Sequence, residues 1–245
     1  MFPPIFSFVA LAILIVFLGC NSKSASYINR PQLTPLMNAA ASDDLSRVQK
    51  LISQGADVRQ RTTNGETALY EAIERRDLNR DNLPVVDALL RAGADPNDIE
   101  IFGSSPLIIS LTREYGNPAV TLRLLDAGAR VPQNCGDGDS VLSLATQDSS
   151  LEVMQALITR KAAVNCQDSP PLYWAALNGE ADRVSLLIQC GADPNLRVKG
   201  TGQTPLEAAM TMNSDRSVQS NFAKTRQLLE KAAKKNSADN QIPAN

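Results

Sequence analysis

Histidine, the side chain most used for acid–base catalysis and metal binding, is absent from the 245 residues of this chain. Its absence excludes Ser-His-Asp and Cys-His catalytic arrangements and any histidine-ligated metal site. Asp137 and Asp139 could begin a calcium loop, but Val141 and Leu142 stand where a ligand and the glycine should be, so we interpret this segment as a turn. No catalytic residue, metal or cofactor is expected, and the four cysteines remain as candidates for chemistry.

A six-residue stretch recurs along the chain, and the other repeated features lie at nearly fixed distances from it. Its copies read TPLMNA, TALYEA, SPLIIS, SVLSLA, PPLYWA and TPLEAA, beginning at residues 34, 67, 105, 140, 170 and 204. Recurrence at steps of 30 to 38 residues is typical of a solenoid. A second landmark keeps nearly fixed offsets from the first and comprises Gly55-Ala56-Asp57, Gly93-Ala94-Asp95, Gly128-Ala129-Arg130, Lys161-Ala162-Ala163 and Gly191-Ala192-Asp193.

Each interval predicts a pair of helices. In the copies that begin at residues 34, 105 and 204, proline in the second position fits the first turn of a helix, preceded by the N-cap residues Thr34, Ser105 and Thr204. A second helix follows, with apolar residues at helical spacing such as Val184, Leu187 and Ile188. Glycines 55, 93, 128 and 191 end those helices where a positive φ is favoured. One such pair cannot bury its apolar face alone, so stacking is expected.

These landmarks resemble the ankyrin-repeat family, whose signature runs T-P-L-H-x-A followed by a G-A-D-x-N turn, over about residues 32–233. The resemblance implies an all-α solenoid of about six helix-turn-helix repeats with projecting β-turn fingers, at about 32–61, 62–100, 101–135, 136–165, 166–197 and 198–233. Residues 234–245 are expected to form a disordered tail. Where the family signature has histidine, this chain has Met37, Tyr70, Ile108, Ser143, Tyr173 and Glu207.

The N-terminal residues differ in kind from the repeats. Ile5 to Leu18 is apolar apart from Ser7, a length that suits a secretory signal and falls short of the roughly 20 residues that span a bilayer. The ending FLGC resembles a bacterial lipoprotein signal. That resemblance implies a signal peptide over residues 1–19, lipidation of Cys20, and a tether over residues 20–31. An uncleaved anchor and an ordinary cleaved signal peptide remain alternatives.

The other three cysteines lie within the repeats. Cys135 and Cys166 fall at adjacent predicted turns, and Cys190 ends a second helix. In an oxidising compartment nearby thiols tend to pair, so a Cys135–Cys166 disulfide is one hypothesis. Neighbouring repeats, however, lie about 10 Å apart, beyond the ~7 Å limit between Cα atoms, and we therefore expect three free buried thiols.

The resemblance also implies a binding surface at the ends of the first helices and at the turn tips. Matching positions are Glu74, Arg75, Ile101, Phe102, Arg113, Gln147, Asp148, Asn178, Arg197 and Lys199. Trp174, the only tryptophan, is a hot-spot candidate by residue type. The alternative for Trp174 is packing between repeats, because Ile109 and Leu144 hold the same place in other copies.

A solenoid of this kind offers a surface for another protein rather than a pocket of converging acids and bases. The formal charge of −2 gives no reason to expect nucleic acid. We therefore expect a non-enzymatic protein, monomeric apart from its partner, lipid-anchored to the inner or outer membrane of a bacterial envelope and facing the periplasm. It would block a toxic or lytic envelope enzyme as an immunity-type protein. The alternatives are a scaffold or protective partner of a resident enzyme and a structural envelope lipoprotein.

Overall fold

The computed structural model describes residues 32–74, 81–99, 103–112, 117–133, 135, 140–211 and 219–239. Within these ranges each repeat contributes a first and a second helix. The first helices are α2 (Pro35–Ala41), α4 (Ala68–Ile73), α6 (Pro106–Ser110), α8 (Val141–Asp148), α10 (Pro171–Leu177) and α12 (Pro205–Thr211). The second helices are α3 (Leu45–Ser53), α5 (Leu83–Arg91), α7 (Pro118–Asp126), α9 (Leu151–Thr159), α11 (Ala181–Gln189) and α13 (Gln219–Asp239).

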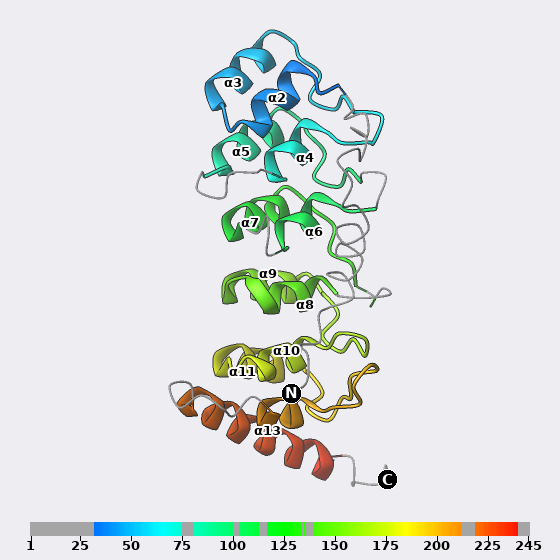
Figure 1. The fold of residues 1–245 in the computed structure, drawn as a ribbon, viewed down its shortest axis with the longest axis vertical. Coiled ribbons are helices and arrows are strands. Elements are labelled where there is room, and N and C mark those ends of the chain that lie inside the picture. The colour runs from blue at the N-terminus through cyan, green and yellow to red at the C-terminus, as the bar shows by residue number, and fades with distance from the viewer. Residues whose placement is uncertain are drawn as a thin grey trace, which may run out of the picture.

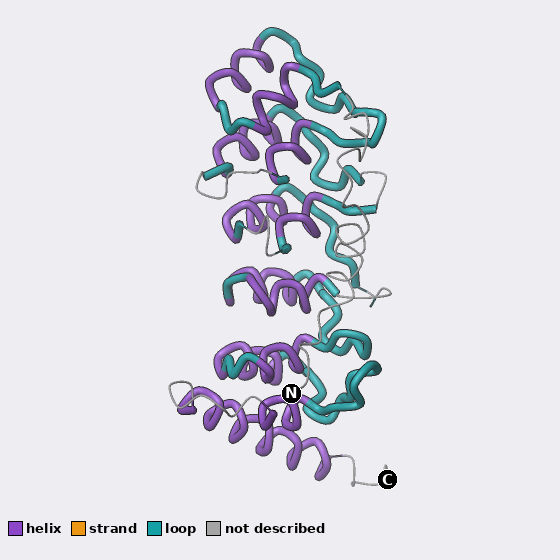
Figure 2. Tube along the Cα trace, in the orientation of Figure 1, coloured by secondary structure: helices purple, strands orange, loops and turns teal. Residues whose placement is uncertain are grey.

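The helix pairs stack in chain order into a single column, from α2 and α3 at one end to α13 at the other (Figure 1). First helices form one row, second helices form another, and the turns that join successive repeats project from the side of the first helices (Figure 1). Helices and loops make up the whole of the described chain, without a strand (Figure 2). The predicted all-α solenoid is therefore confirmed.

The first helices begin as the N-cap pattern predicts. The Thr34 hydroxyl accepts from the Met37 N–H at 3.2 Å, and the Ser105 hydroxyl accepts from the Ile108 N–H at 3.4 Å. Thr204 and Glu207 form a reciprocal capping box. The Thr204 hydroxyl accepts from the Glu207 N–H at 3.3 Å, and the Thr204 N–H donates to the Glu207 carboxylate at 2.7 Å. Each cap satisfies a backbone donor that the helix leaves unpaired.

The core runs unbroken along the column because equivalent positions are buried in successive repeats. The leucine in the third position of the recurring stretch is at most 2% exposed at 36, 69, 107, 142 and 172. A valine in the first half of the second helices α3, α5, α7, α9 and α11 is fully buried, at 48, 86, 120, 153 and 184. These side chains belong to one apolar cluster, so each repeat is stabilised by its neighbours, as in other solenoids.

Polar side chains also join successive turns. They come from the residue four positions after the first residue of the second landmark. Arg59 Nε donates to the Gly93 carbonyl at 2.9 Å. Asn97 Nδ2 donates to the Gly128 carbonyl at 3.2 Å, and Asn165 Nδ2 donates to the Gly191 carbonyl at 3.0 Å. Pro132 holds this position at the junction of the third and fourth repeats and has no side-chain donor. The side chain at this position therefore cannot donate a hydrogen bond to the next turn.

The C-terminal end of the chain differs from the prediction. We expected a disordered tail from residue 234, and this is wrong for residues 234–239, which continue helix α13. Helix-favouring alanine and lysine occupy this stretch, and Asn236 Nδ2 donates to Asp193 Oδ1 at 2.9 Å, which holds the helix against the preceding turn. Lys231, Lys234 and Lys235 are exposed, as a polar end cap requires.

Residues 1–31, with the predicted signal and Cys20, lie outside the described residues. Among the helices of the described ranges, none combines the length and the apolar character required to cross a bilayer.

Candidate protein-binding surface

Two of the residues that replace the family histidine bond to the following repeat. The Ser143 hydroxyl donates to the Ser169 carbonyl. The Tyr173 hydroxyl donates to Gln203 Oε1 at 3.1 Å. Both contacts lie in the C-terminal half of the column, where they couple a first helix to the turn that follows. Serine and tyrosine thus supply contacts between repeats at positions where the family signature has histidine.

Trp174 lies on helix α10 and is held in one orientation. Its indole Nε1 donates to the Ser169 hydroxyl at 2.7 Å. Its ring meets Tyr173 edge-to-face, with centroids 5.6 Å apart and planes at 84°. With Leu177, it packs against the buried cluster of Tyr173, Val198 and Ala208. Trp174 nevertheless remains only partly buried, so inter-repeat packing leaves part of its surface accessible.

Two cations from the last projecting turn lie beside this cluster, because Arg197 and Lys199 flank the buried Val198. The side chain of Arg197 is 62% exposed; its Nη1 donates to the Gly202 carbonyl at 2.6 Å and lies 3.3 Å from Glu207 Oε2. The side chain of Lys199 is 73% exposed, with Nζ 3.1 Å from Asp168 Oδ1. Both cations keep most of their surface free for a partner.

Neighbouring groups stabilise the ionised form of the Glu207 carboxylate. The Thr204 backbone N–H lowers the pKa of Glu207, and the Thr204 hydroxyl and the Arg197 guanidinium act in the same direction. The group remains ionised at neutral pH and orients Arg197 beside the aromatic cluster.

Of the remaining described candidates, Asn178 ends the helix that carries Trp174 and its N–H donates to the Trp174 carbonyl at 3.0 Å. Glu74, Gln147 and Asn178 lie at the C-terminal ends of α4, α8 and α10, and Gln147 Nε2 is buried with no hydrogen-bond partner in the described structure. The predicted residues Arg75, Ile101, Phe102 and Arg113 lie outside the described residues, as does the side chain of Asp148. Of the predicted contacts, Trp174 and Asn178 lie one turn apart at the end of helix α10, and Arg197 and Lys199 flank Val198 of the cluster against which Trp174 packs.

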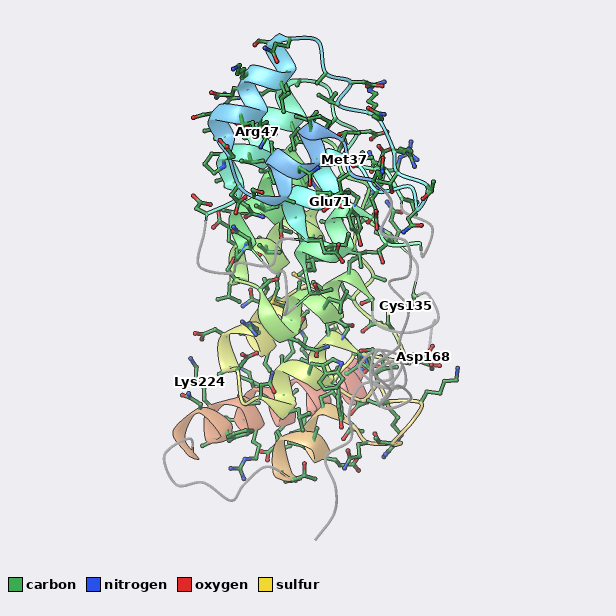
Figure 3. All side chains as sticks on the ribbon, turned by 45° about the horizontal axis from the view of Figure 1, so that its top comes forward. Met37, Arg47, Glu71, Cys135, Asp168 and Lys224 are labelled. Carbon is green, nitrogen blue, oxygen red and sulfur yellow. A yellow bond between two sulfur atoms is a disulfide. The ribbon has the colours of Figure 1, made fainter. Side chains whose placement is uncertain are left out.

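A disulfide joins Cys135 to Cys166, and the expectation of free thiols at these two positions is wrong. Their Cα atoms lie 5.4 Å apart, within the range of about 4.4–6.8 Å that a disulfide bridges. The turn that carries Cys166 lacks the glycine-bearing finger of the other turns, so the two chain segments approach more closely than regular repeats do. Cys190 is free and partly buried. Cys135 and Asp168 lie on the side of the turns (Figure 3).

The turn of residues 165–169, the short turn, bonds in several directions. The Gln167 carbonyl accepts from the Lys199 N–H at 3.0 Å. Asn165 Oδ1 accepts from the Asp193 N–H at 2.8 Å. Asp168 pairs with Lys199, and Ser169 contacts both Ser143 and Trp174. Sequence reasoning missed the roles of Gln167, Asp168 and Ser169; the missing glycine marked an irregular turn but not its partners.

Within the described residues, no cluster of three or more Cys, Asp or Glu side chains could hold a metal ion. The surface therefore consists of an oriented indole, an apolar base and two exposed cations, an arrangement suited to polypeptide contacts.

The chain is similar to curated proteins along most of its length. It is 32% identical to human mitochondrial disaggregase over 215 residues, which cover 82% of this chain and 27% of that protein. The bovine mitochondrial disaggregase is 29% identical over 208 residues, covering 82% of this chain and 24% of that protein. The chain thus spans about a quarter of the length of these relatives.

Solved structures share the fold. An ankyrin repeat domain from Acinetobacter baumannii is 28% identical, with a TM-score of 0.64 and coverage of 81% of this chain and 97% of that one. A chain from the complex of a Bdellovibrio bacteriovorus predatory endopeptidase with an immunity protein is 24% identical, with a TM-score of 0.61 and coverage of 82% and 98%. The second likeness is one of fold alone.

A sequence model of ankyrin repeats in three copies matches residues 10–100 and 108–198. These two matches take in more than half of the chain and contain four of the six recurring stretches in full. The match agrees with the stacked helix pairs and with the solved domains of the same fold. The chain belongs to the ankyrin repeat family.

Proposed function

We propose that this chain binds another protein in the bacterial envelope through the Trp174 surface, which comprises Trp174, Leu177, Arg197 and Lys199. The ankyrin repeat fold is a scaffold for protein–protein interaction. The observation that carries the proposal is the partly exposed indole of Trp174, oriented by Ser169 and Tyr173 beside two largely exposed cations.

Residue types and rigidity both favour this surface as the centre of an interface. Tryptophan and arginine are enriched among the few residues that dominate binding energy. An indole that is already oriented loses little conformational freedom when a partner binds, so more of the contact energy appears as affinity. Helix α10, which carries Trp174, belongs to the row of first helices, and this row continues through α8, α6 and α4 to α2 (Figure 1).

Two features support the envelope as the compartment. The Cys135–Cys166 disulfide is of a kind that persists in oxidising compartments and is rare in the bacterial cytosol. The N-terminal apolar run that ends in Cys20 supplies a lipid anchor in this proposal. A membrane tether raises the effective concentration of the chain for a partner at the same membrane.

We propose an inhibitory, immunity-type role against a toxic or lytic envelope enzyme. A complex of a predatory endopeptidase with an immunity protein contains a chain of this fold, which provides a precedent for such a pairing. A scaffold for a resident envelope enzyme is the alternative, and the effect of binding on the activity of the partner distinguishes the two.

Affinity capture from detergent-solubilised envelope tests the surface. Wild type is compared with Trp174→Ala and with the control Leu151→Ala, which removes an apolar side chain that is 42% exposed on helix α9. We expect the partner to be captured by wild type and by Leu151→Ala but lost from Trp174→Ala, whose folding is checked by circular dichroism. Equal capture by all three folded proteins would contradict the proposal. If Trp174→Ala unfolds, the double variant R197A/K199A replaces it.

The role and the tether need separate measurements. The activity of a captured enzyme is assayed with and without the added chain; inhibition supports the immunity-type role, whereas unchanged or increased activity supports a scaffold. For the tether, Cys20→Ser is expected to abolish metabolic labelling with fatty acid. Labelling that persists in Cys20→Ser would contradict lipidation at that cysteine.

A further inference from the structure

The short turn lies between the disulfide and the Trp174 surface. Cys166 anchors one end of it to Cys135, in the turn that precedes the fourth repeat. Ser169, three residues further on, is 5% exposed and contacts two other elements. Its carbonyl accepts from the Ser143 hydroxyl, and its own hydroxyl accepts from the Trp174 indole. A covalent cross-link and the orienting contact of the indole thus belong to one short segment.

The same segment also fixes one of the two cations of the surface, Lys199. The Gln167 carbonyl accepts from the Lys199 N–H at 3.0 Å, and the Asp168 carboxylate pairs with the Lys199 ammonium at 3.1 Å. Both the indole and Lys199 are therefore held by residues that follow Cys166 directly. A displacement of this segment would change the positions of both.

We infer that the Cys135–Cys166 disulfide regulates the Trp174 surface by holding the short turn that orients Trp174 and Lys199. This inference rests on the proposed function for its consequence on binding. The oxidised chain is the binding-competent form, and reduction loosens the short turn. Hydrogen bonds at a solvent-exposed turn hold it less firmly than a covalent link, so the indole gains freedom that binding must then remove.

The reductant is a dithiol, and the exchange proceeds in two steps. Cys135 is exposed and Cys166 is fully buried, so a thiolate of the reductant attacks Sγ of Cys135. The S–S bond breaks, Cys166 leaves as a thiolate and takes up a proton. The second thiol of the reductant then attacks the mixed disulfide, forms its own intramolecular disulfide and releases Cys135 as a thiol. Two electrons and two protons pass from the dithiol to the chain.

Trp174 is the only tryptophan, so intrinsic fluorescence reports on this site without a partner. Acrylamide quenching is measured on the folded, oxidised chain and after treatment with dithiothreitol. We expect stronger quenching and a red-shifted emission maximum after reduction. The double variant C135S/C166S should match the reduced chain and no longer respond to dithiothreitol, whereas Cys190→Ser should respond as wild type does.

A second variant guards against loss of the fold. Ser169→Ala keeps the disulfide and removes only the hydroxyl that accepts from the indole, so it should shift the quenching in the same direction as reduction does. Far-UV circular dichroism checks that the helices persist. If the reduced chain unfolds, Ser169→Ala in the oxidised chain decides the inference. Unchanged quenching in both the folded reduced chain and Ser169→Ala would overturn it.

Capture of the partner then tests the consequence. We expect the reduced, folded chain to bind about two- to tenfold more weakly, the scale expected when one pre-oriented side chain becomes free. Equal binding by the oxidised and reduced chains would overturn the regulation and leave the proposed function intact. Failure of both forms to capture a partner would contradict the proposed function, and the fluorescence result would still support or overturn the positioning of Trp174 by the disulfide.

Discussion

Neighbouring turns are joined differently at two junctions of the column. The first junction lies between the second and third repeats, and the second lies between the third and fourth. At the first, Asn97 donates to the Gly128 carbonyl and accepts from the Arg130 N–H at 2.7 Å. At the second, Pro132 stands where Asn97 stands and has no side-chain donor, and the Cys135–Cys166 disulfide joins the two turns instead. A covalent link thus occurs where the periodic polar contact is missing.

The difference shows that a contact between repeats can be replaced by a chemically different one while the stack continues. Within the stack, the buried leucine and valine rows run through both junctions without interruption. The turns are therefore free to vary, as loops are when the core carries the fold. The short turn that orients Trp174, between the fourth and fifth repeats, is another such variation.

The largest expected effect comes from removing the covalent link. The loop closed by the disulfide has a sequence separation of 31 residues, for which chain entropy predicts a loss of about 3–4 kcal/mol in the free energy of unfolding in C135S/C166S. Urea unfolding of this variant, of wild type and of Cys190→Ser measures the loss. A midpoint equal to that of wild type would show that the second junction does not depend on the disulfide.

The next effect compares two glycines with positive φ. A Cβ at Gly179 (φ 70°) would lie 2.9 Å from the ring of Phe222, whereas a Cβ at Gly55 (φ 85°) would have no atom within 4 Å. We expect Gly55→Ala to cost about 1 kcal/mol from backbone strain alone and Gly179→Ala about 2–4 kcal/mol, because overpacking is added. Thermal unfolding of both variants checks the order. Equal losses would mean that Phe222 moves aside freely.

A smaller effect sharpens the comparison of the junctions. Asn97→Ala and Asn165→Ala each remove a donor to a glycine carbonyl and an acceptor for the following turn, and each should cost about 1–2 kcal/mol. Asn165 adjoins Cys166, so the loss at Asn165 should increase after reduction, whereas the loss at Asn97 should not. Urea unfolding with and without dithiothreitol tests this. A change of equal size at both positions would contradict a local role for the disulfide.

The smallest effect is the acid dependence of the last turn. The pKa of Glu207 is lowered from its ordinary value of 4.5 in the folded chain, so its ionised form stabilises the fold above that value. This stabilisation is lost as the pH falls through the lowered pKa. Glu207→Gln should therefore be less stable than wild type near neutral pH and approach it in acid. Urea midpoints between about pH 7 and about pH 3 measure the difference, and a pH-independent gap would contradict this assignment.

Much of the fold could be predicted because its signals are local. Thr34 and Ser105 cap helices through bonds to residues three positions on, so their types and the following prolines were sufficient. The contacts around Trp174 were not predictable in this way. Ser169 directly precedes helix α10, but its contact with Ser143 depends on how closely the short turn approaches the fourth repeat, and no residue pattern near Ser169 marks that approach. The disulfide was not predictable either, because the regular spacing of ankyrin repeats holds equivalent turns too far apart for a disulfide.

By itself the sequence determined the repeat period, the order of helix pairs and the leucine and valine rows that become the core, since these depend on spacing along the chain. Only the tertiary structure decided that Cys135 and Cys166 bond, and that Trp174 packs against the cluster of Val198, the residue between Arg197 and Lys199. The physical reason is that such contacts depend on the distance between neighbouring turns. That distance changes where one turn lacks its glycine-bearing residues.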